Sequence, residues 1–189
     1  MKSPAVRKAK FIRGKSLGFR DACVQDAAFI LALRTNEQKS RHLSKVSADL
    51  QNQKDWLLAY QARKNEAYFV IENLERDKLG MVRIYDAQGE SFCWGSWILS
   101  NDAPSTAAIE SALMVYAYAM GTLGFSMAHF QVNKANERVW KFHERFGAIR
   151  RAEDADQFHY VLSGQAIAVS MKRYERYLPT GIVVEELDA

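Results

Sequence analysis

The sequence predicts an α+β protein, a single domain in which helices cover a mixed, mostly antiparallel sheet. Segments whose apolar residues recur every three or four positions, as in helices, are interspersed with apolar stretches typical of strands. Three of the strand-like stretches follow one another without a helix between them, which indicates an antiparallel meander. The order of these segments predicts six to seven strands flanked by four to five helices.

The elements follow in a definite order along the chain. A first strand is expected over residues 17–24, followed by amphipathic helices over 25–36 and 48–64. The meander occupies residues 66–73, 79–87 and 91–99, and the longest helix covers 107–124. A strand over 125–133, a helix over 133–148, a hairpin over 148–164 and a helix over 165–178 complete the order. Pro179 is expected to end the last helix.

Composition and cysteine content are those of an ordinary globular protein. The chain has 189 residues, 48% of them hydrophobic and 25% charged, which suits one domain. Its longest apolar run, residues 112–120, is about half of what a bilayer span needs, so no membrane partner is expected. Cys23 and Cys93 are far apart, which fits two free thiols in a reducing, cytoplasmic setting.

The first residues are basic, and the rest of the chain is slightly acidic. The net charge is +4, yet residues 1–20 contain seven basic side chains and no acid. We expect residues 1–16 to form a loose basic arm, residues 17–179 the domain, and residues 180–189 a tail. The alternative is an arm that contacts a polyanion, but nucleic acid is not an expected partner because the rest of the chain is not basic.

The start of the longest helix is a candidate anion site. Ser105 and Thr106 are expected to cap this helix, and Ala107 and Ala108 leave the first-turn N–H groups unobstructed. Such a terminus can hold a phosphate, because it combines spare N–H donors with the positive end of the helix dipole. The alternative is an ordinary capped helix that binds no anion, which would have the same kind of sequence.

The segment NKANERVWKFHERFGA, residues 133–148, raises a question about its histidine. Asn136 suits the N-cap of an amphipathic helix, and His143 lies one turn from Val139 on its apolar side. The imidazole either holds the core together or moves a proton. The residues alone leave both readings open.

Taken together, these segments resemble the GNAT superfamily of acyl-CoA-dependent N-acetyltransferases. The resemblance spans roughly residues 17 to 163, and its most specific part is the family pattern around the last helix. That pattern is filled in order by Asn136, Val139, Phe142, His143, Arg145 and Gly147.

The resemblance implies a fold that binds acetyl-CoA between two splayed strands, without a metal. Its pyrophosphate would lie on residues 105–108, and its pantetheine arm would pair with Trp97, Ile98 and Leu99 and contact Asn136. The backbone at Trp97 would polarise the thioester carbonyl. The chain departs from the family where Thr106 stands at the first glycine of the phosphate loop, and Ala108 takes the second small position. No basic residue precedes the loop.

The resemblance also assigns roles near the reacting atoms. In many family members a tyrosine protonates the departing thiolate, and His143 occupies that position here. A buried core histidine is the alternative. Arg41 and His42 fall in a segment that commonly lines the acceptor site in this family. The alternative is that the two residues belong to a solvated loop.

Four other residues need an interpretation. Strand alternation predicts that Trp94 and Trp97 face opposite sides, one in the core and one against substrate, and Trp94 is a candidate substrate contact. Glu110 is interpreted as structural rather than as a base. A route through an acyl-Cys93 lacks an activating neighbour.

The predicted activity is direct acetyl transfer from acetyl-CoA to an amine. The closest resemblance is to members that act on small amines such as nucleotide-linked amino sugars. A protein N-terminus is the alternative acceptor, and a non-catalytic acyl-CoA-binding regulatory module is a second alternative. The expected partner is a small-molecule amine or a nucleotide sugar, and a homodimer is compatible with the sequence.

Overall fold

The computed structural model describes residues 3–42 and 45–187, which form one nine-stranded sheet with six α-helices. The strands are β1 (Ala9–Arg13), β2 (Leu17–Asp21), β3 (Ala67–Asn73), β4 (Lys78–Gln88), β5 (Ser91–Leu99), β6 (Met127–Asn133), β7 (Ile149–Glu153), β8 (Gln157–Ser163) and β9 (Val183–Glu186). The helices are α1 (Ala27–Thr35), α2 (Glu37–Ser40), α3 (Leu50–Ala62), α4 (Ala107–Tyr116), α5 (Glu137–Arg145) and α6 (Gly164–Arg173). A π-helical turn, Ala117–Thr122, continues α4.

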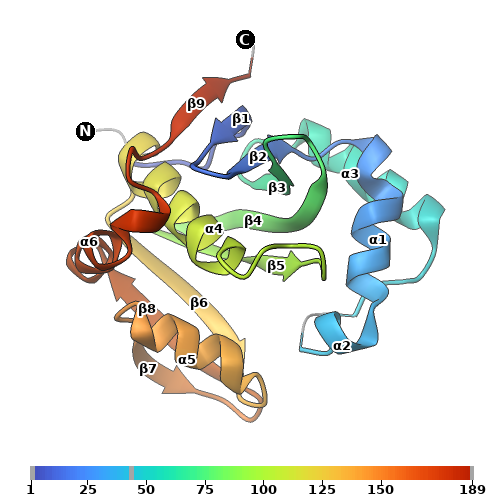
Figure 1. The fold of residues 1–189 in the computed structure, drawn as a ribbon. Coiled ribbons are helices and arrows are strands. Elements are labelled where there is room, and N and C mark those ends of the chain that lie inside the picture. Colours follow the sequence, from blue (N-terminus) through green and yellow to red (C-terminus); the bar gives the residue numbers. More distant parts are fainter. Residues whose placement is uncertain (1–2, 43–44, 188–189) are drawn as a thin grey trace.

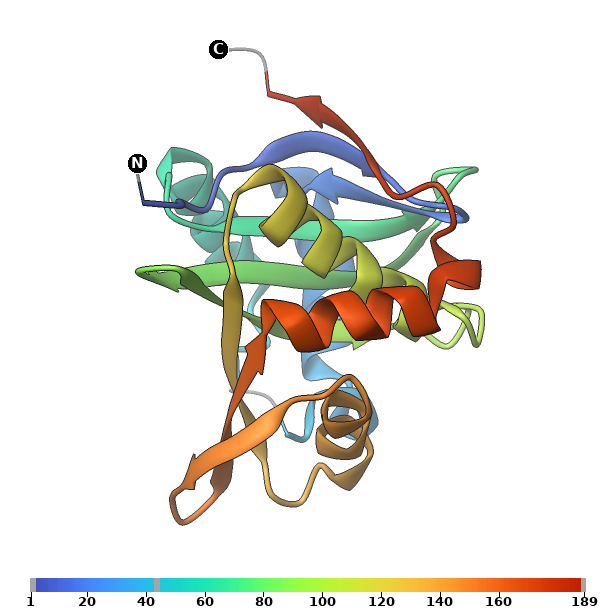
Figure 2. The same ribbon diagram turned by 90° about the vertical axis from the view of Figure 1, so that its left-hand side faces the viewer.

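The sheet is mixed and mostly antiparallel, as predicted. Its strand order is β7-β8-β6-β5-β4-β3-β2-β1-β9 (Figures 1 and 2). Every neighbouring pair is antiparallel except β5 and β6, which run parallel because α4 connects them. The three-stranded meander of β3, β4 and β5 is confirmed by their successive antiparallel pairing.

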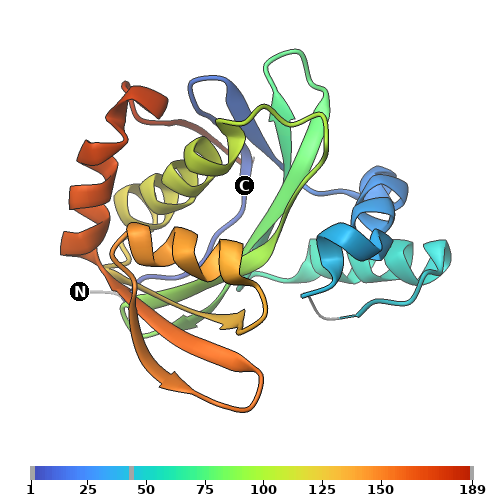
Figure 3. The same cartoon turned by 60° about the horizontal axis from the view of Figure 1, so that its bottom comes forward.

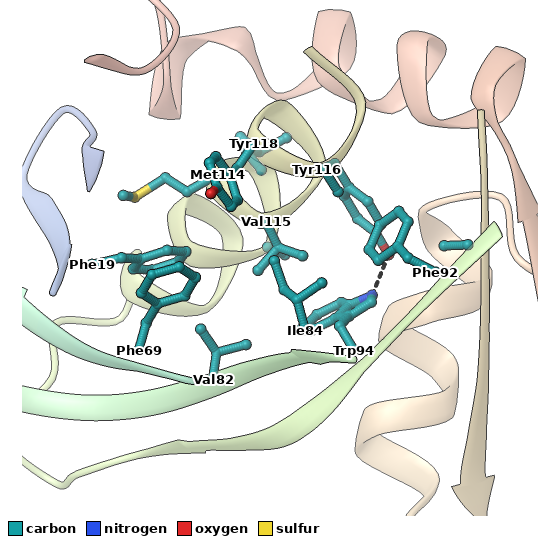
Figure 4. Close-up of a cluster of buried hydrophobic side chains, with 14 of the residues drawn as sticks. Phe19, Phe69, Val82, Ile84, Phe92, Trp94, Met114, Val115, Tyr116 and Tyr118 are labelled. Atoms are coloured by element: carbon teal, nitrogen blue, oxygen red, sulfur yellow. Dashed lines mark hydrogen bonds between the residues drawn. The ribbon is translucent and has the colours of Figure 1, made fainter. Parts of the chain in front are cut away.

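Helices cover both faces of the sheet, and each face has its own core. α4, α5 and α6 lie on one side, here called the α4 face, and α1 and α3 lie on the other, the α1 face (Figure 3). Strand alternation divides β3 between them: Phe69 and Ile71 pack in the core of the α4 face, while Tyr68 and Val70 pack in that of the α1 face. The aromatic core of the α4 face lies beneath helix α4 (Figure 4).

The loose arm expected over residues 1–16 is contradicted where the structure describes it. Residues 9–13 form β1, whose Ala9, Phe11 and Ile12 are buried while the basic Lys10 and Arg13 point outward. Five residues with three apolar side chains suffice for a strand once β2 and β9 pair with it. The part of this expectation that concerns residues 1–2 lies outside the described residues.

The tail beyond residue 180 is likewise part of the sheet. Val183–Glu186 form β9, which pairs antiparallel with β1. The sheet therefore has nine strands instead of six or seven, because two short strands extend it at one edge. Short strands rich in charge carry little apolar signal, so the sequence pattern does not mark them. Residues 188–189 lie outside the described part of the chain.

Glu110 fastens the start of α4 to the turn between β1 and β2. Its buried carboxylate accepts hydrogen bonds from the backbone N–H groups of Ser16, at 2.6 Å, and Leu17, at 2.9 Å. Gly14 lies so close that an added Cβ would stand 2.9 Å from a carboxylate oxygen. These contacts agree with the structural interpretation of Glu110.

Candidate active site

Strands β5 and β6 separate in the middle of the sheet. Their parallel pairing covers only residues 91–93 of β5, and the last paired residues are Cys93 and His129. Beyond this point the two strands diverge (Figure 1), so residues 94–99 have β4 as their only paired neighbour. Backbone groups along one side of β5 are thus left for a ligand, which fits the pantetheine arm of acetyl-CoA.

A β-bulge interrupts β5 just after this separation. The register against β4 shifts between Met81 and Arg83, and Ser96 adopts a positive φ of 48°. A bulge adds a residue to one strand and reverses the alternation of the side chains that follow. The prediction that Trp94 and Trp97 face opposite sides is therefore wrong, since their ring centroids lie 5.3 Å apart.

The two tryptophans nevertheless differ in exposure. Trp94 is buried among the core residues of the α4 face, and its Nε1 donates to the hydroxyl of Tyr116 at 3.3 Å (Figure 4). Trp97 is half-buried, and its Nε1 donates to Ser111 Oγ at 3.2 Å. The burial of Trp94 favours its core role over a contact with substrate. Ile98 packs on the α1 face, and Leu99 lies on the α4 face.

His143 lies inside a cluster of aromatic rings beside the separated strands. Its ring centroid is 4.2 Å from that of Phe130 and 5.3 Å from that of Trp94, and Trp97 and Phe142 complete the surroundings. Burial lowers the pKa of His143 to about 3, so the imidazole is neutral near neutral pH. Its Nδ1 is buried and has no hydrogen-bond partner.

The start of α4 follows β5 by a short loop. Thr106 occupies the N-cap position, but its side chain makes no capping hydrogen bond, so the predicted capping is wrong. The backbone N–H of Ala107 donates to Pro104 O at 2.9 Å instead. Ser105 and Thr106 are exposed, and Ala108 is half-buried. With no side chain over its N–H groups, this helix start fits a phosphate despite the missing glycine.

Asn136 stands at the N-cap of α5, as predicted, but its side chain makes no capping hydrogen bond. Its backbone carbonyl accepts from the N–H groups of Val139 and Trp140. The half-buried amide group is therefore available for another partner.

Arg41 and His42 follow helix α2, close to the end of β5. Lys39 ties α2 to this strand by donating to Leu99 O at 2.7 Å, and Arg34 of α1 donates to Ser96 Oγ at 3.2 Å. Arg41 is exposed, and burial together with the Arg41 charge lowers the pKa of the His42 imidazole. The structure thus places both residues on the α1 side of β5.

A polar cavity on the α1 face adjoins the bulged strand. Its volume is about 330 Å³, and it is lined by Arg63, Asn65, Glu66, Arg83, Tyr85 and Asp86. Arg83 pairs across the β4–β5 ladder with Gly95, the residue that precedes Ser96. Its guanidinium forms an ion pair with the buried Glu66. Sequence analysis missed these residues, because long-range strand pairing alone brings them together.

Other chemistry has little support in the described residues. Burial raises the pKa of the Cys93 thiol to about 11, which makes it a poor nucleophile at neutral pH. Within the described ranges no group of three or more histidine, cysteine or acidic residues could hold a metal ion. No helix among the described residues is long and apolar enough to cross a membrane.

A parallel pair of strands that separate beside a bulge, with an uncapped helix start after the first of them, fits the binding of an acyl-CoA. A family model described as "Acetyltransferase (GNAT) domain" matches residues 16–149. The chain belongs to the GNAT acetyltransferases, a family of acyl-CoA-dependent N-acetyltransferases.

Solved structures agree with this assignment. One of them, described as "Apo FdhC- a nucleotide-linked sugar GNAT", is 35% identical over 92% of this chain and 99% of that chain, with a TM-score of 0.81. A GCN5-related N-acetyltransferase from Brucella melitensis is 14% identical over 93% of this chain and 88% of its own, with a TM-score of 0.76. The spermidine N-acetyltransferase from Vibrio cholerae in complex with CoA and spermine is 15% identical over 81% and 98%, with a TM-score of 0.70. The last two show likeness of fold alone. No curated protein matched the chain.

Proposed function

We propose that this protein transfers the acetyl group of acetyl-CoA to the amino group of a small molecule, an amino sugar linked to a nucleotide. The observation that carries the proposal is the 35% identity, over nearly the full length of both chains, to FdhC, a nucleotide-linked sugar GNAT. The polar lining of the cavity of about 330 Å³ beside β5 supports it, because the hydroxyl and amino groups of a sugar need hydrogen-bonding partners.

The residues of the site suggest how each end of acetyl-CoA would be held. The N–H groups at residues 105–108 other than that of Ala107, which donates to Pro104 O, would bind the pyrophosphate. The unpaired side of β5 would take the pantetheine arm through Ile98 and Leu99. The amide of Asn136 would add a hydrogen bond. When bound, acetyl-CoA supplies a thioester whose carbonyl carbon is attacked by the acceptor amine, and the backbone N–H of Trp97 would polarise that carbonyl.

His143 would act as a proton relay in this scheme. A neutral imidazole carries one N–H and one lone pair, so it can receive a proton from the acceptor nitrogen and pass another to the leaving sulfur. The low pKa of His143 favours this relay over donation from a charged imidazolium. Its unpartnered Nδ1 provides one of the two positions that such a relay needs.

Calorimetric titration with acetyl-CoA, followed by an acceptor screen that measures thiol release, tests the proposal. The screen compares a nucleotide-linked amino sugar with the free amino sugar, spermidine and a peptide with a free N-terminus. We expect the highest kcat/KM for the nucleotide-linked sugar. Preference for the peptide would contradict the proposed acceptor, and absence of acetyl-CoA binding would favour a role other than catalysis.

A further inference from the structure

Three polar side chains from three strands form a hydrogen-bonded chain on the α1 face. His129 of β6 stands in the middle: its Nδ1 lies 2.8 Å from Ser91 Oγ of β5, and its Nε2 lies 3.1 Å from Asp86 Oδ2 of β4. The ring is partly exposed, with 22% of the side chain accessible. Because an ionised carboxylate only accepts, Nε2 carries the ring proton of the neutral form and Nδ1 accepts from Ser91.

These three hydrogen-bonded residues lie where the two central strands, β5 and β6, separate. Ala128 and Phe130 pack in the core of the α4 face, so His129 between them points to the α1 face. His129 is also the last residue of β6 that pairs with β5, through Cys93. Asp86 lines the polar cavity on the same face, so the carboxylate that holds His129 is shared with the candidate acceptor pocket.

Glu66, Tyr85 and Cys93 are also titratable, and they lie at the cavity or on the strands beside these three residues. Glu66 is held in ion pairs with Arg63 and Arg83. Burial raises the pKa of Tyr85 and of Cys93, so both stay protonated. The residue of β8 opposite His129 is Val161, which does not titrate.

We propose that His129 is the general base that takes the proton from the acceptor's ammonium group, with Asp86 as its positioning residue. The inference rests on the proposed function, since it concerns the same acceptor. A protonated amine has no lone pair and cannot attack, so one proton must leave before transfer. His129 accepts a proton on Nδ1 from the Ser91 hydroxyl, which takes the acceptor's proton through water on the open face in exchange. The ring becomes an imidazolium that faces the Asp86 carboxylate.

The remaining steps balance without a further reagent. The freed amine nitrogen forms a bond to the thioester carbon as the carbon–sulfur bond breaks. The second nitrogen proton reaches the thiolate through His143. His129 then returns its proton to solvent, so that each turnover yields one amide, one free thiol and one released proton.

The test compares His129→Gln with a matched control, His159→Gln. His159 lies on β8 of the same sheet, and its Nε2 contacts Asp154 Oδ2 at 2.8 Å, so it is a similarly paired histidine away from the separated strands. With the nucleotide-linked amino sugar near neutral pH, we expect His129→Gln to lower kcat by roughly 10²-fold and His159→Gln by less than threefold. Both variants should retain the far-UV circular dichroism of the parent.

Hydroxylamine, an acceptor that is uncharged near neutral pH, isolates the role of the base. It needs no prior deprotonation, so His129→Gln should lower its turnover by less than threefold. Raising the pH should restore the variant with the amino sugar, because free amine then forms without help. Asp86→Asn should lower kcat, and Asp86→Glu, which keeps the carboxylate, should recover part of the loss.

The outcomes separate this inference from the proposed function. If the parent binds acetyl-CoA and acetylates the sugar but His129→Gln matches it in kcat and pH profile, His129 is not the base. An equal loss with both acceptors would also overturn the inference, since it would indicate a general structural defect. Absence of acetyl-CoA binding by the parent would instead overturn the proposed function.

Discussion

The rings of Trp94 and Trp97 lie 5.3 Å apart on one face of β5, although the two residues are three positions apart in the sequence rather than two or four. The left-handed conformation of Ser96 between them causes this arrangement. The same bulge brings the backbone of Trp97 to the place where β5 and β6 have separated. Packing of the aromatic core and geometry of the site therefore depend on one backbone conformation.

Ser96→Val should disturb both the packing of the aromatic core and the geometry of the site. A β-branched residue at a positive φ is strained, so we expect the free energy of unfolding to fall by about 1–3 kcal/mol and kcat to fall with it. Ser96→Gly is the matched control, because it also loses the hydroxyl that Arg34 contacts but tolerates the conformation. Denaturant unfolding and initial rates measure the two effects. Equal stability of both variants would show that the bulge is not strained.

His143→Gln should lower kcat more than tenfold and leave the Kd for acetyl-CoA nearly unchanged. The side chain lies beside Trp97, and in the proposed scheme it moves protons during transfer without binding acetyl-CoA. Steady-state rates and calorimetry provide the two readouts. If kcat is unchanged, the ring is an ordinary core residue.

The buried His143 should also make stability depend on pH. Its pKa is lowered from 6.5 to about 3 in the folded protein, so the unfolded chain binds a proton more readily. The contribution of this group is therefore complete above about pH 6.5 and is lost as the pH falls toward 3, at up to about 1.4 kcal/mol per pH unit. Denaturant unfolding between pH 6.5 and 4 should show a steeper slope for the parent than for His143→Gln. Parallel slopes would contradict the burial of a neutral ring.

Ala108→Pro should weaken acetyl-CoA binding by about tenfold. Proline removes one N–H at the start of α4, yet it is tolerated in the first turn of a helix. Thr106→Ala serves as the control, because the threonine side chain makes no capping bond and should not affect affinity. Calorimetric titration with acetyl-CoA measures the affinity of both variants. Unchanged affinity in Ala108→Pro would place the phosphates elsewhere.

Glu110→Ala should destabilise the fold rather than the chemistry. Its removal leaves the buried N–H of Leu17 without an acceptor and also removes the hydrogen bonds from Ser16, which costs about 1–3 kcal/mol. At a temperature where the variant is folded, kcat should stay within a factor of three. A large loss of kcat with unchanged stability would instead identify Glu110 as a base.

Much of the fold was predictable from local patterns. Strand β5 begins and ends where the apolar pattern of residues 91–99 places it, and α5 lies within the predicted segment. The bulge was not predictable, because a serine at positive φ leaves no mark in the sequence. Its effect on Trp94 and Trp97 was therefore missed as well.

Some residues of the candidate site were likewise predictable from local patterns, and others were not. His143 and the start of α4 belong to segments with their own helical pattern, so their positions could be inferred from the sequence. Asp86 and Ser91 meet across the β4–β5 hairpin, but only the long-range pairing of β6 with β5 brings His129 to them. Burial of His143, which decides its charge, also depends on rings from β5 and β6.

The contact between Glu110 and the β1–β2 turn bears on how far this protein can be trimmed. A chain shortened to begin at Leu17 would lose Ser16, and with it two of the hydrogen bonds that hold the buried carboxylate. It would also remove β1, leaving β9 without its partner strand. The first 16 residues therefore support the start of α4, where we propose that the phosphates bind. Removing them should weaken acetyl-CoA binding as well as the fold.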